Sequence, residues 1–248
     1  MIEKIKPIKL LRVYPIWNLF VSIFILSGCS DDEIIPKEQF TPYQKEVMEY
    51  FVDVALGFEF GDASKVTRKW KSEVRIFVGG DKTAEMLSEL DGIISELEEL
   101  TDQLSFSITQ DTTESNFYLY FGTGSSFALR FPPAQNHIAA NWGLFYVYYN
   151  SSDEIYSAVM YVDTQRAQGD ARKHLLREEL TQSLGLARDS DRYPQSIFYG
   201  PWTTGTVYAP IDRDLVRLLY HPNVGTGYNE TVVRTVLKDL VKQLNIGA

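Results

Sequence analysis

Apolar residues recur at helical spacing in five segments of the chain. The first predicted helix begins at Thr41, because Thr41 and Gln44 have capping-box spacing and Pro42 stands at the favoured first helical position. The second covers residues 83–100, with Asp81 as its expected N-cap, and carries apolar residues at intervals of three and four. The other predicted helices are 171–184, 212–220 and 230–243.

Alternation of apolar and polar residues predicts the strands. In residues 71–78, Val74, Ile76 and Val78 alternate with Glu73, Arg75 and Phe77, and this strand is expected to end at Gly79 and Gly80. Residues 122–125 are expected to form a loop, and residues 125–141 are expected to be irregular. The other predicted strands are 104–109, 116–121, 145–149 and 155–162, of which the last two form a hairpin. This order of helices and strands predicts a mixed α/β (α+β) domain, in which helices pack on one twisted mixed sheet.

The start of the chain has the pattern of a secretory signal. Four basic residues among the first 12 precede an apolar run from Ile16 to Leu26, which leads into Ser27, Gly28 and Cys29. This ending resembles the lipobox of bacterial lipoproteins, which implies a lipoprotein signal peptide over residues 1–28 and lipid on Cys29. The alternative is a short transmembrane anchor with a chance cysteine. A run of about 11 residues is, however, too short to cross a hydrocarbon core of roughly 30 Å as a helix.

The same resemblance implies a lipid membrane as a partner, reached through acylated Cys29, and a place at the outer membrane of a bacterial cell envelope. Residues 29–40 would be the lipidated cysteine and an acidic tether, since Ser30-Asp31-Asp32-Glu33 follows the cysteine directly. Such a run is usually a solvated tether. It also resembles the sorting signal of lipoproteins that some Gram-negative bacteria send to the cell surface, and both interpretations stay open. The remaining residues, 41–248, are enough for one domain with a sizeable core.

Charge and cysteine content narrow the possible partners. The formal net charge is −9 and no basic patch stands out, which argues against nucleic acid. Cys29 is the single cysteine, so once it carries lipid no thiol is left for a disulfide or a thiolate metal site. The domain is therefore expected to hold by packing alone.

The stretch from His174 to Ser190 carries most of the candidate chemistry. Within it, residues 178–188 resemble the motif H-E-x-x-H-x-x-G-x-x-H of the metzincin zinc peptidases. The resemblance places Glu179 on the catalytic glutamate and Gly185 on the glycine that ends the active-site helix. The positions of the three zinc histidines are taken by Glu178, Gln182 and Arg188.

The resemblance continues downstream. Ser196–Tyr199 looks like the Met-turn, with Phe198 at the methionine position, and residues 209–220 resemble the helix that closes the matrixin domain. The segment R-E-E-L-T-Q-x-L-G-L is also similar to a bacterial family of unknown function. Together these features imply a metzincin-like single domain with a degenerate zinc site.

The replaced ligands disfavour zinc. Gln182 is a poor ligand, and Arg188 has no lone pair to offer. Our hypothesis is that the guanidinium of Arg188 takes the place of the metal by pairing with Glu178 or Glu179. No cofactor is therefore expected.

Two other chemistries stay open at this helix. His174 and Glu178 lie four residues apart and so share one helix face, where they could bind a metal if Asp189 or Asp191 supplied a third ligand. An acid/base pair could use Glu178 or Glu179, which point about 100° apart and so need another partner carboxylate. The candidates for that partner are Asp189, Asp191 and Asp212, while His137 and His221 are expected to be solvent-facing or structural.

Three functions compete on this evidence. The first, favoured by the loss of the zinc histidines, is a non-catalytic module that binds an extended peptide or an envelope protein at an exposed strand edge. The aromatic segment from Trp142 to Tyr149 is a candidate for that edge, although core packing would explain it as well. The second is a hydrolase (peptidase-like) with a non-standard site and Glu179 as general base. The third is a structural component of an envelope assembly.

Overall fold

A six-stranded sheet forms the centre of the fold. Its strands are β1 Lys69–Trp70, β2 Val74–Gly80, β3 Phe106–Thr109, β4 Phe117–Gly122, β5 Gly143–Tyr149 and β6 Glu154–Asp163. β6 pairs in parallel with β4 and, at its start, with β1, whereas β5 pairs antiparallel with β6. β2 and β3 continue the parallel part beyond β4. The predicted β5–β6 hairpin is therefore confirmed, and it brings β5 to an edge of the sheet.

The computed structural model describes residues 39–247. The predicted signal peptide, Cys29 and the tether up to residue 38 lie outside this range. Among the described residues, no helix combines the length and the apolar character that crossing a membrane requires.

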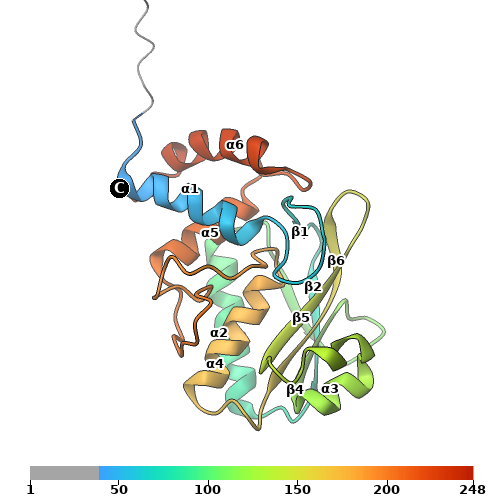
Figure 1. Ribbon diagram of the computed structural model, residues 1–248. Helices are drawn as coiled ribbons and strands as arrows, with labels where there is room; N and C mark the ends of the chain where they lie inside the picture. The colour runs from blue at the N-terminus through green and yellow to red at the C-terminus, as the bar shows by residue number, and fades with distance from the viewer. Residues whose placement is uncertain (1–38, 248) are drawn as a thin grey trace, which may run out of the picture. The chain divides into compact units, whose positions relative to one another are not determined.

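Helices cover both faces of the sheet (Figure 1). They are α1 Pro42–Ala55, α2 Ala84–Leu100, α3 Gly124–Arg130, the 3-10 helix η1 Pro132–Asn136, α4 Asp170–Gln182, α5 Pro210–Tyr220 and α6 Glu230–Gln243. α4 packs against β5 and β6 and contacts α2, while α3 packs against β4 and β6. Side chains along a strand alternate between faces, so Leu119 and Phe121 of β4 enter the larger core with α2 and α4, and Tyr120 enters a smaller core with α3. The expected mixed α/β single domain is confirmed.

Local signals explain most helix starts. Thr41 and Gln44 form the predicted capping box, in which each side chain bonds to the backbone of the other. α2, however, is capped by Thr83 and not by Asp81, because the Thr83 hydroxyl accepts a hydrogen bond from the backbone of Met86. The correction follows from position, since Thr83 directly precedes the helix.

Residues 122–141 differ from the expectation of a loop and an irregular segment. They contain α3 and η1, and Thr123 caps α3 by accepting a hydrogen bond of 3.1 Å from the backbone of Ser126. α3 has only 7 residues, which is too short for a helical repeat of apolar positions to be visible in the sequence.

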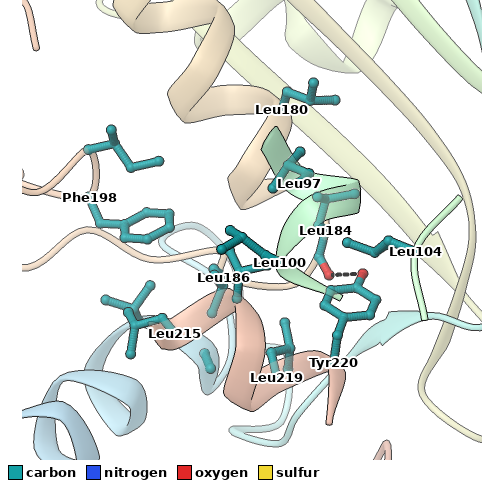
Figure 2. Packing of buried hydrophobic residues seen from close by; sticks show 14 of the residues in the cluster. Leu97, Leu100, Leu104, Leu180, Leu184, Leu186, Phe198, Leu215, Leu219 and Tyr220 are labelled. Carbon is teal, nitrogen blue, oxygen red and sulfur yellow. Dashed lines mark hydrogen bonds between the residues drawn. The ribbon is translucent and has the colours of Figure 1, made fainter. Parts of the chain in front are cut away.

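The end of α4 is fixed by the larger core (Figure 2). Leu180 and Leu184 pack in one cluster with Leu215 of α5 and with Phe198 from the preceding loop. The Tyr220 hydroxyl donates a hydrogen bond of 2.8 Å to the backbone oxygen of Leu184. These contacts hold α4 in place, and with it the polar side chains that α4 presents on its other side.

Candidate functional site

A cavity of about 610 Å³ lies between β5 and α4. Its other walls come from residues 58–63 after α1, residues 137–142 before β5, and the segments 187–189 and 199–203 between α4 and α5. No lysine or arginine occurs among the described residues that line it. Its acidic side chains are Glu59, Glu178, Glu179 and Asp189.

His174 and Glu178 form a bonded pair on α4. His174 is buried, its Nδ1 lies 2.7 Å from the backbone oxygen of Gly205, and its Nε2 lies 3.3 Å from Oε2 of Glu178. Burial lowers the pKa of His174, but the hydrogen bond and the negative charge of Glu178 raise it, and the net pKa is raised. A protonated imidazole satisfies both contacts, because both ring nitrogens then donate.

Glu179 is the most isolated polar group in the cavity. It is 8% exposed, and its carboxylate takes part in no hydrogen bond with any residue from 39 to 247. Oε1 lies so close to Gly143 that a Cβ there would be 2.4 Å away. Burial raises the pKa of Glu179 well above its usual value, and the charges of Glu178, Asp189 and Glu59 raise it further. The protonated form is therefore favoured far above the pH range of an ordinary glutamate.

Glu178 and Glu179 both line this one cavity. We expected adjacent helix residues, which point about 100° apart, not to face the same ligand. The cavity extends along α4 from the Gly205 loop, beside His174, to the start of β5, beside Gly143, and so it reaches both carboxylates.

Asp189 and Glu59 add two further carboxylates. Oδ1 of Asp189 accepts a hydrogen bond of 2.6 Å from Nε2 of Gln182. Burial raises the pKa of Asp189 to about 7, with contributions from the charges of Glu178 and Glu59. Burial and the charge of Glu178 also raise the pKa of Glu59. The cavity thus holds four acidic side chains, and burial and neighbouring negative charges raise the pKa of three of them, Glu59, Glu179 and Asp189.

Aromatic rings form the outer part of the cavity. Trp142 and Trp202 meet edge to face with ring centroids 5.0 Å apart, and Phe60 lies 5.3 Å from the ring of His137. Phe60, Trp142 and Trp202 each keep more than a third of their surface exposed. Exposed rings beside a cavity offer apolar surface to a ligand. His137 is half-buried at this rim, in keeping with a supporting role.

β5 presents a free backbone edge to this cavity. It pairs with β6 and with no other described strand. The backbone nitrogen of Asp163 donates a hydrogen bond of 2.7 Å to the oxygen of Trp142, which fixes the phase of the ladder. The backbone groups of Gly143, Phe145 and Val147 therefore point away from β6. Phe145 and Val147 also pack against the larger core, so β5 serves as edge and as core strand together.

The hypothesis for Arg188 is wrong. Arg188 is half-buried, does not line the cavity, and forms no ion pair or hydrogen bond within residues 39–247. The physical reason is that Glu178 already has a partner in His174, one helical turn earlier. Glu179 remains without any partner among the described residues.

The motif positions do not fit zinc. Glu178 is bonded to His174, the amide nitrogen of Gln182 donates to Asp189, and Arg188 has no lone pair. No group of three or more His, Cys, Asp or Glu side chains in the described part of the chain is arranged to hold a metal ion. His174 and Glu178 therefore lack the third ligand that the alternative metal site requires.

Gly185 has the conformation that the resemblance implied. Its φ is +115°, and a Cβ there would lie 1.9 Å from the backbone oxygen of Arg68. Its nitrogen donates a hydrogen bond of 2.9 Å to the oxygen of Gln182, the last residue of α4. Both the positive φ and the close approach require glycine at this turn.

The segment Ser196–Tyr199 forms a buried turn that Asp212 supports. Asp212 accepts hydrogen bonds from the backbone nitrogens of Ile197 at 3.1 Å and Ala209 at 2.8 Å, and from the Ser196 hydroxyl. Burial raises the pKa of Asp212 to about 6 although these hydrogen bonds lower it. Phe198 is fully buried in the core (Figure 2). Asp212 is thus a structural residue and not an acid/base partner in the cavity.

Sequence reasoning did not single out Glu59, Phe60 or Trp202, and it included Gly143 only as part of the segment from Trp142 to Tyr149. Glu59 lies in a loop between Gly57 and Gly61, where no periodic pattern indicates which side chain reaches a cavity. Gly143 begins an aromatic strand, and a glycine there is a signal for close backbone approach that could have been noticed.

The chain has similarity to one protein family and to several solved structures. The model of a family described as "Protein of unknown function (DUF2927)" matches residues 44–239. No curated protein matches the sequence. A crystal structure of myroilysin is similar with 13% identity and a TM-score of 0.38, covering 73% of this chain and 97% of that chain. Metalloproteinase-II from Bacteroides fragilis is similar with 12% identity and a TM-score of 0.36, covering 70% of this chain and 60% of that one.

Proposed function

This chain belongs to the DUF2927 family, and from its cleft we propose that it is a non-catalytic module that binds an extended peptide along β5. The observation that carries the proposal is the cavity of about 610 Å³ beside a strand edge whose outward backbone groups lack strand partners among the described residues. A peptide that adds to such an edge gains main-chain hydrogen bonds, and pockets beside the edge select its side chains.

The dimensions of the edge suit a short extended segment. β5 has 7 residues, which span roughly 23 Å at about 3.3 Å per residue. Gly143, Phe145 and Val147 offer outward donors and acceptors to a partner strand. Trp142 and Trp202 stand beside the same cavity and offer rings for the side chains of such a peptide.

A metzincin-like ancestry without zinc chemistry is part of the proposal. It is supported by Gly185, which turns the chain after α4 with a positive φ, and by the buried Ser196–Tyr199 turn that Asp212 holds. The donor set at Glu178, Gln182 and Arg188 does not suit zinc, and the proposal involves no cofactor.

A metal-free hydrolase is the second candidate. The observation that favours it is the pair of carboxyl groups with raised pKa, Glu179 and Asp189, in one cavity. It ranks second because a general base has to be ionised, whereas burial of Glu179 favours its protonated form. Mass spectrometry of a bound peptide after long incubation separates the two candidates, since a hydrolase returns fragments and a binding module returns the intact peptide.

Strand addition can be tested at Val147. In the substitution Val147→Pro the outward N–H is lost, while the ladder to β6 is kept because proline is tolerated where the N–H faces away from the sheet. Val147→Ala is the matched control, since it also loses side-chain packing but keeps the N–H. Decapeptides selected on the full-length chain from a random phage library are expected to bind the alanine variant and not the proline variant. Equal binding to both variants would overturn the proposal.

We propose, separately, that Cys29 carries lipid and that the domain is held at the outer membrane of a bacterial envelope. The support is the basic start, the apolar run and the Leu26–Cys29 ending of the sequence. Cells grown with an alkyne fatty acid should label the wild-type chain and not Cys29→Ser. Protease treatment of intact cells then distinguishes the surface face from the periplasmic face.

A further inference from the structure

Glu179 differs from the other buried carboxylates of residues 39–247, which all accept hydrogen bonds from the protein. Asp163 accepts hydrogen bonds from the backbone nitrogens of Gly124, Gln165 and Arg166, as well as from the Arg166 guanidinium. Asp212 accepts from two backbone nitrogens and a hydroxyl. Glu179, at 8% exposure, accepts from no residue between 39 and 247, although it lines the cavity. The fully buried side-chain polar atoms without a partner in this part of the chain belong to Arg68 and Arg177, so the Glu179 oxygens are open to the cavity, where a ligand can supply the donor that the protein does not.

The charges around Glu179 indicate which kind of donor this is. Glu178, Asp189 and Glu59 all act on Glu179 as like charges. The one cationic side chain that approaches them from α4, His174, is bonded to Glu178. The described lining contains no lysine or arginine. A cationic donor would therefore relieve the repulsion and supply the missing hydrogen bond in one step.

The position of Glu179 links this donor to the β5 edge. Glu179 lies against Gly143, the first residue of β5, on the side of the sheet that α4 covers. Alternate side chains of a strand added to β5 point to that same side. A long side chain of the added strand can thus reach Glu179 while its backbone stays on the edge, and Trp142 and Trp202 can pack against its apolar stem.

We propose that the part of the cavity lined by Glu59, Glu178, Glu179 and Asp189, the acidic end of the cleft, is a subsite for the cationic side chain of a lysine or arginine, with Glu179 as the buried counter-charge. The inference rests on the proposed peptide-binding function and specifies its ligand. Binding converts Glu179 from the carboxylic acid to the carboxylate, so one proton leaves Glu179 for solvent as the cation arrives. Asp189 and Glu59, which line the same cavity and whose pKa values are also raised, share in this proton release.

Selection on the full-length chain tests the subsite. Decapeptides from the random phage library should share a lysine or arginine at one position when selected on the wild-type chain. The shared basic residue should disappear in selections on Glu179→Gln, which keeps the size of the side chain and removes its charge. It should persist in selections on Glu99→Gln, an equal change of charge at an exposed site on α2.

A peptide from this selection then allows a direct measurement. Replacing its basic residue by citrulline, which keeps the shape of arginine without the charge, should weaken binding about tenfold or more, since hydrogen bonds between charged groups are strong. Calorimetry in phosphate and in Tris should give different binding heats, because the released proton is taken up by the buffer. Equal affinity for arginine and citrulline, or equal heats in both buffers, would overturn the subsite.

The two proposals can fail separately. If the selected peptides discriminate Val147→Pro from Val147→Ala but show no basic residue, strand addition stands and the cationic subsite falls. If they carry a basic residue that depends on Glu179 but bind both Val147 variants equally, the subsite stands and strand addition falls. If no peptide is enriched on the wild-type chain, both proposals fall.

Discussion

The carboxylate of Glu179 and the backbone of Gly143 occupy neighbouring space so tightly that a Cβ on Gly143 would lie 2.4 Å from Oε1 and 2.7 Å from Cγ of Glu179. Gly143 has an ordinary backbone conformation, so the need for glycine comes from this contact and not from φ. The start of β5 and the acidic end of the cleft are therefore one structural unit.

This contact predicts a coupling between the two residues. Gly143→Ala is expected to destabilise the fold by about 1–3 kcal/mol, because the added methyl group forces the Glu179 side chain to move. The cost should largely vanish in the background of Glu179→Ala, which gives a coupling energy of about 0.5–3 kcal/mol in a double-mutant cycle followed by urea unfolding. Gly92→Ala in α2 is the control, since open space surrounds that position and alanine favours the helix. Independent effects of Gly143 and Glu179 would contradict the contact.

The sequence predicts elements better than it predicts the site. Helix α6, residues Glu230–Gln243, was predicted with its observed bounds because its apolar stripe is long and regular. α3 and the two-residue strand β1 were not predicted, since neither is long enough to show a period. The capping box of Thr41 and Gln44 was predicted as well, because its two residues lie only three positions apart in the sequence.

The site depends on which side chains meet from distant segments, and no local pattern contains that information. The α4 residues His174, Glu178 and Glu179 could be chosen from the motif, whereas Glu59 could not. Arg188 was assigned to the wrong partner because the sequence does not show that His174 lies beside Glu178. The sequence indicated β5 only as a possible edge strand, whereas the structure shows that it pairs with β6 and with no other described strand.

Because the pKa of Asp189 is raised, we expect the free energy of unfolding to fall as pH rises through the acid range. Its pKa is raised to about 7 in the folded chain by burial and by the charges of Glu178 and Glu59. Between about pH 4 and pH 7 the unfolded chain has released this proton while the folded chain still holds it, so the free energy of unfolding falls by at most about 1.4 kcal/mol per pH unit. In Asp189→Asn this part of the slope should be absent. Urea unfolding of both proteins at pH 4, 5, 6 and 7 measures the difference, and parallel curves would contradict the assignment.

For Lys69 we expect the opposite dependence, a free energy of unfolding that rises with pH in the alkaline range. Its ammonium is buried, and Nζ donates hydrogen bonds of 2.8 Å to the oxygen of Leu219 and 3.3 Å to the oxygen of His221. Burial lowers the pKa of Lys69 to about 7, and the nearby charge of Lys71 contributes. Between about pH 7 and the ordinary lysine value near 10.4 the unfolded chain holds a proton that the folded chain has lost, so stability rises with pH.

Lys69→Met should remove this rise, because methionine keeps the apolar stem and has no titrating group. Guanidinium unfolding between pH 7 and pH 9.5 compares the two proteins in a range below the ionisation of the buried tyrosines. Lys238→Met is the control, since Lys238 on α6 is exposed and does not contribute to the lowered pKa of Lys69. A wild-type curve that stays flat over this range would contradict the buried amine.

Gly185 and Arg188 predict opposite outcomes at two positions of the same motif. Gly185→Ala combines a φ of +115° with a Cβ 1.9 Å from the backbone oxygen of Arg68, so it is expected to destabilise the fold by about 3 kcal/mol or more. Arg188→Ala removes a side chain that has no ion pair within residues 39–247, and its effect should stay within about 0.5 kcal/mol. Urea unfolding of both variants beside the wild type measures these costs. A large loss in Arg188→Ala would restore the idea that its guanidinium holds the carboxylates of α4, whereas a small one would show that the turn after α4 depends on its glycine and not on an ion pair.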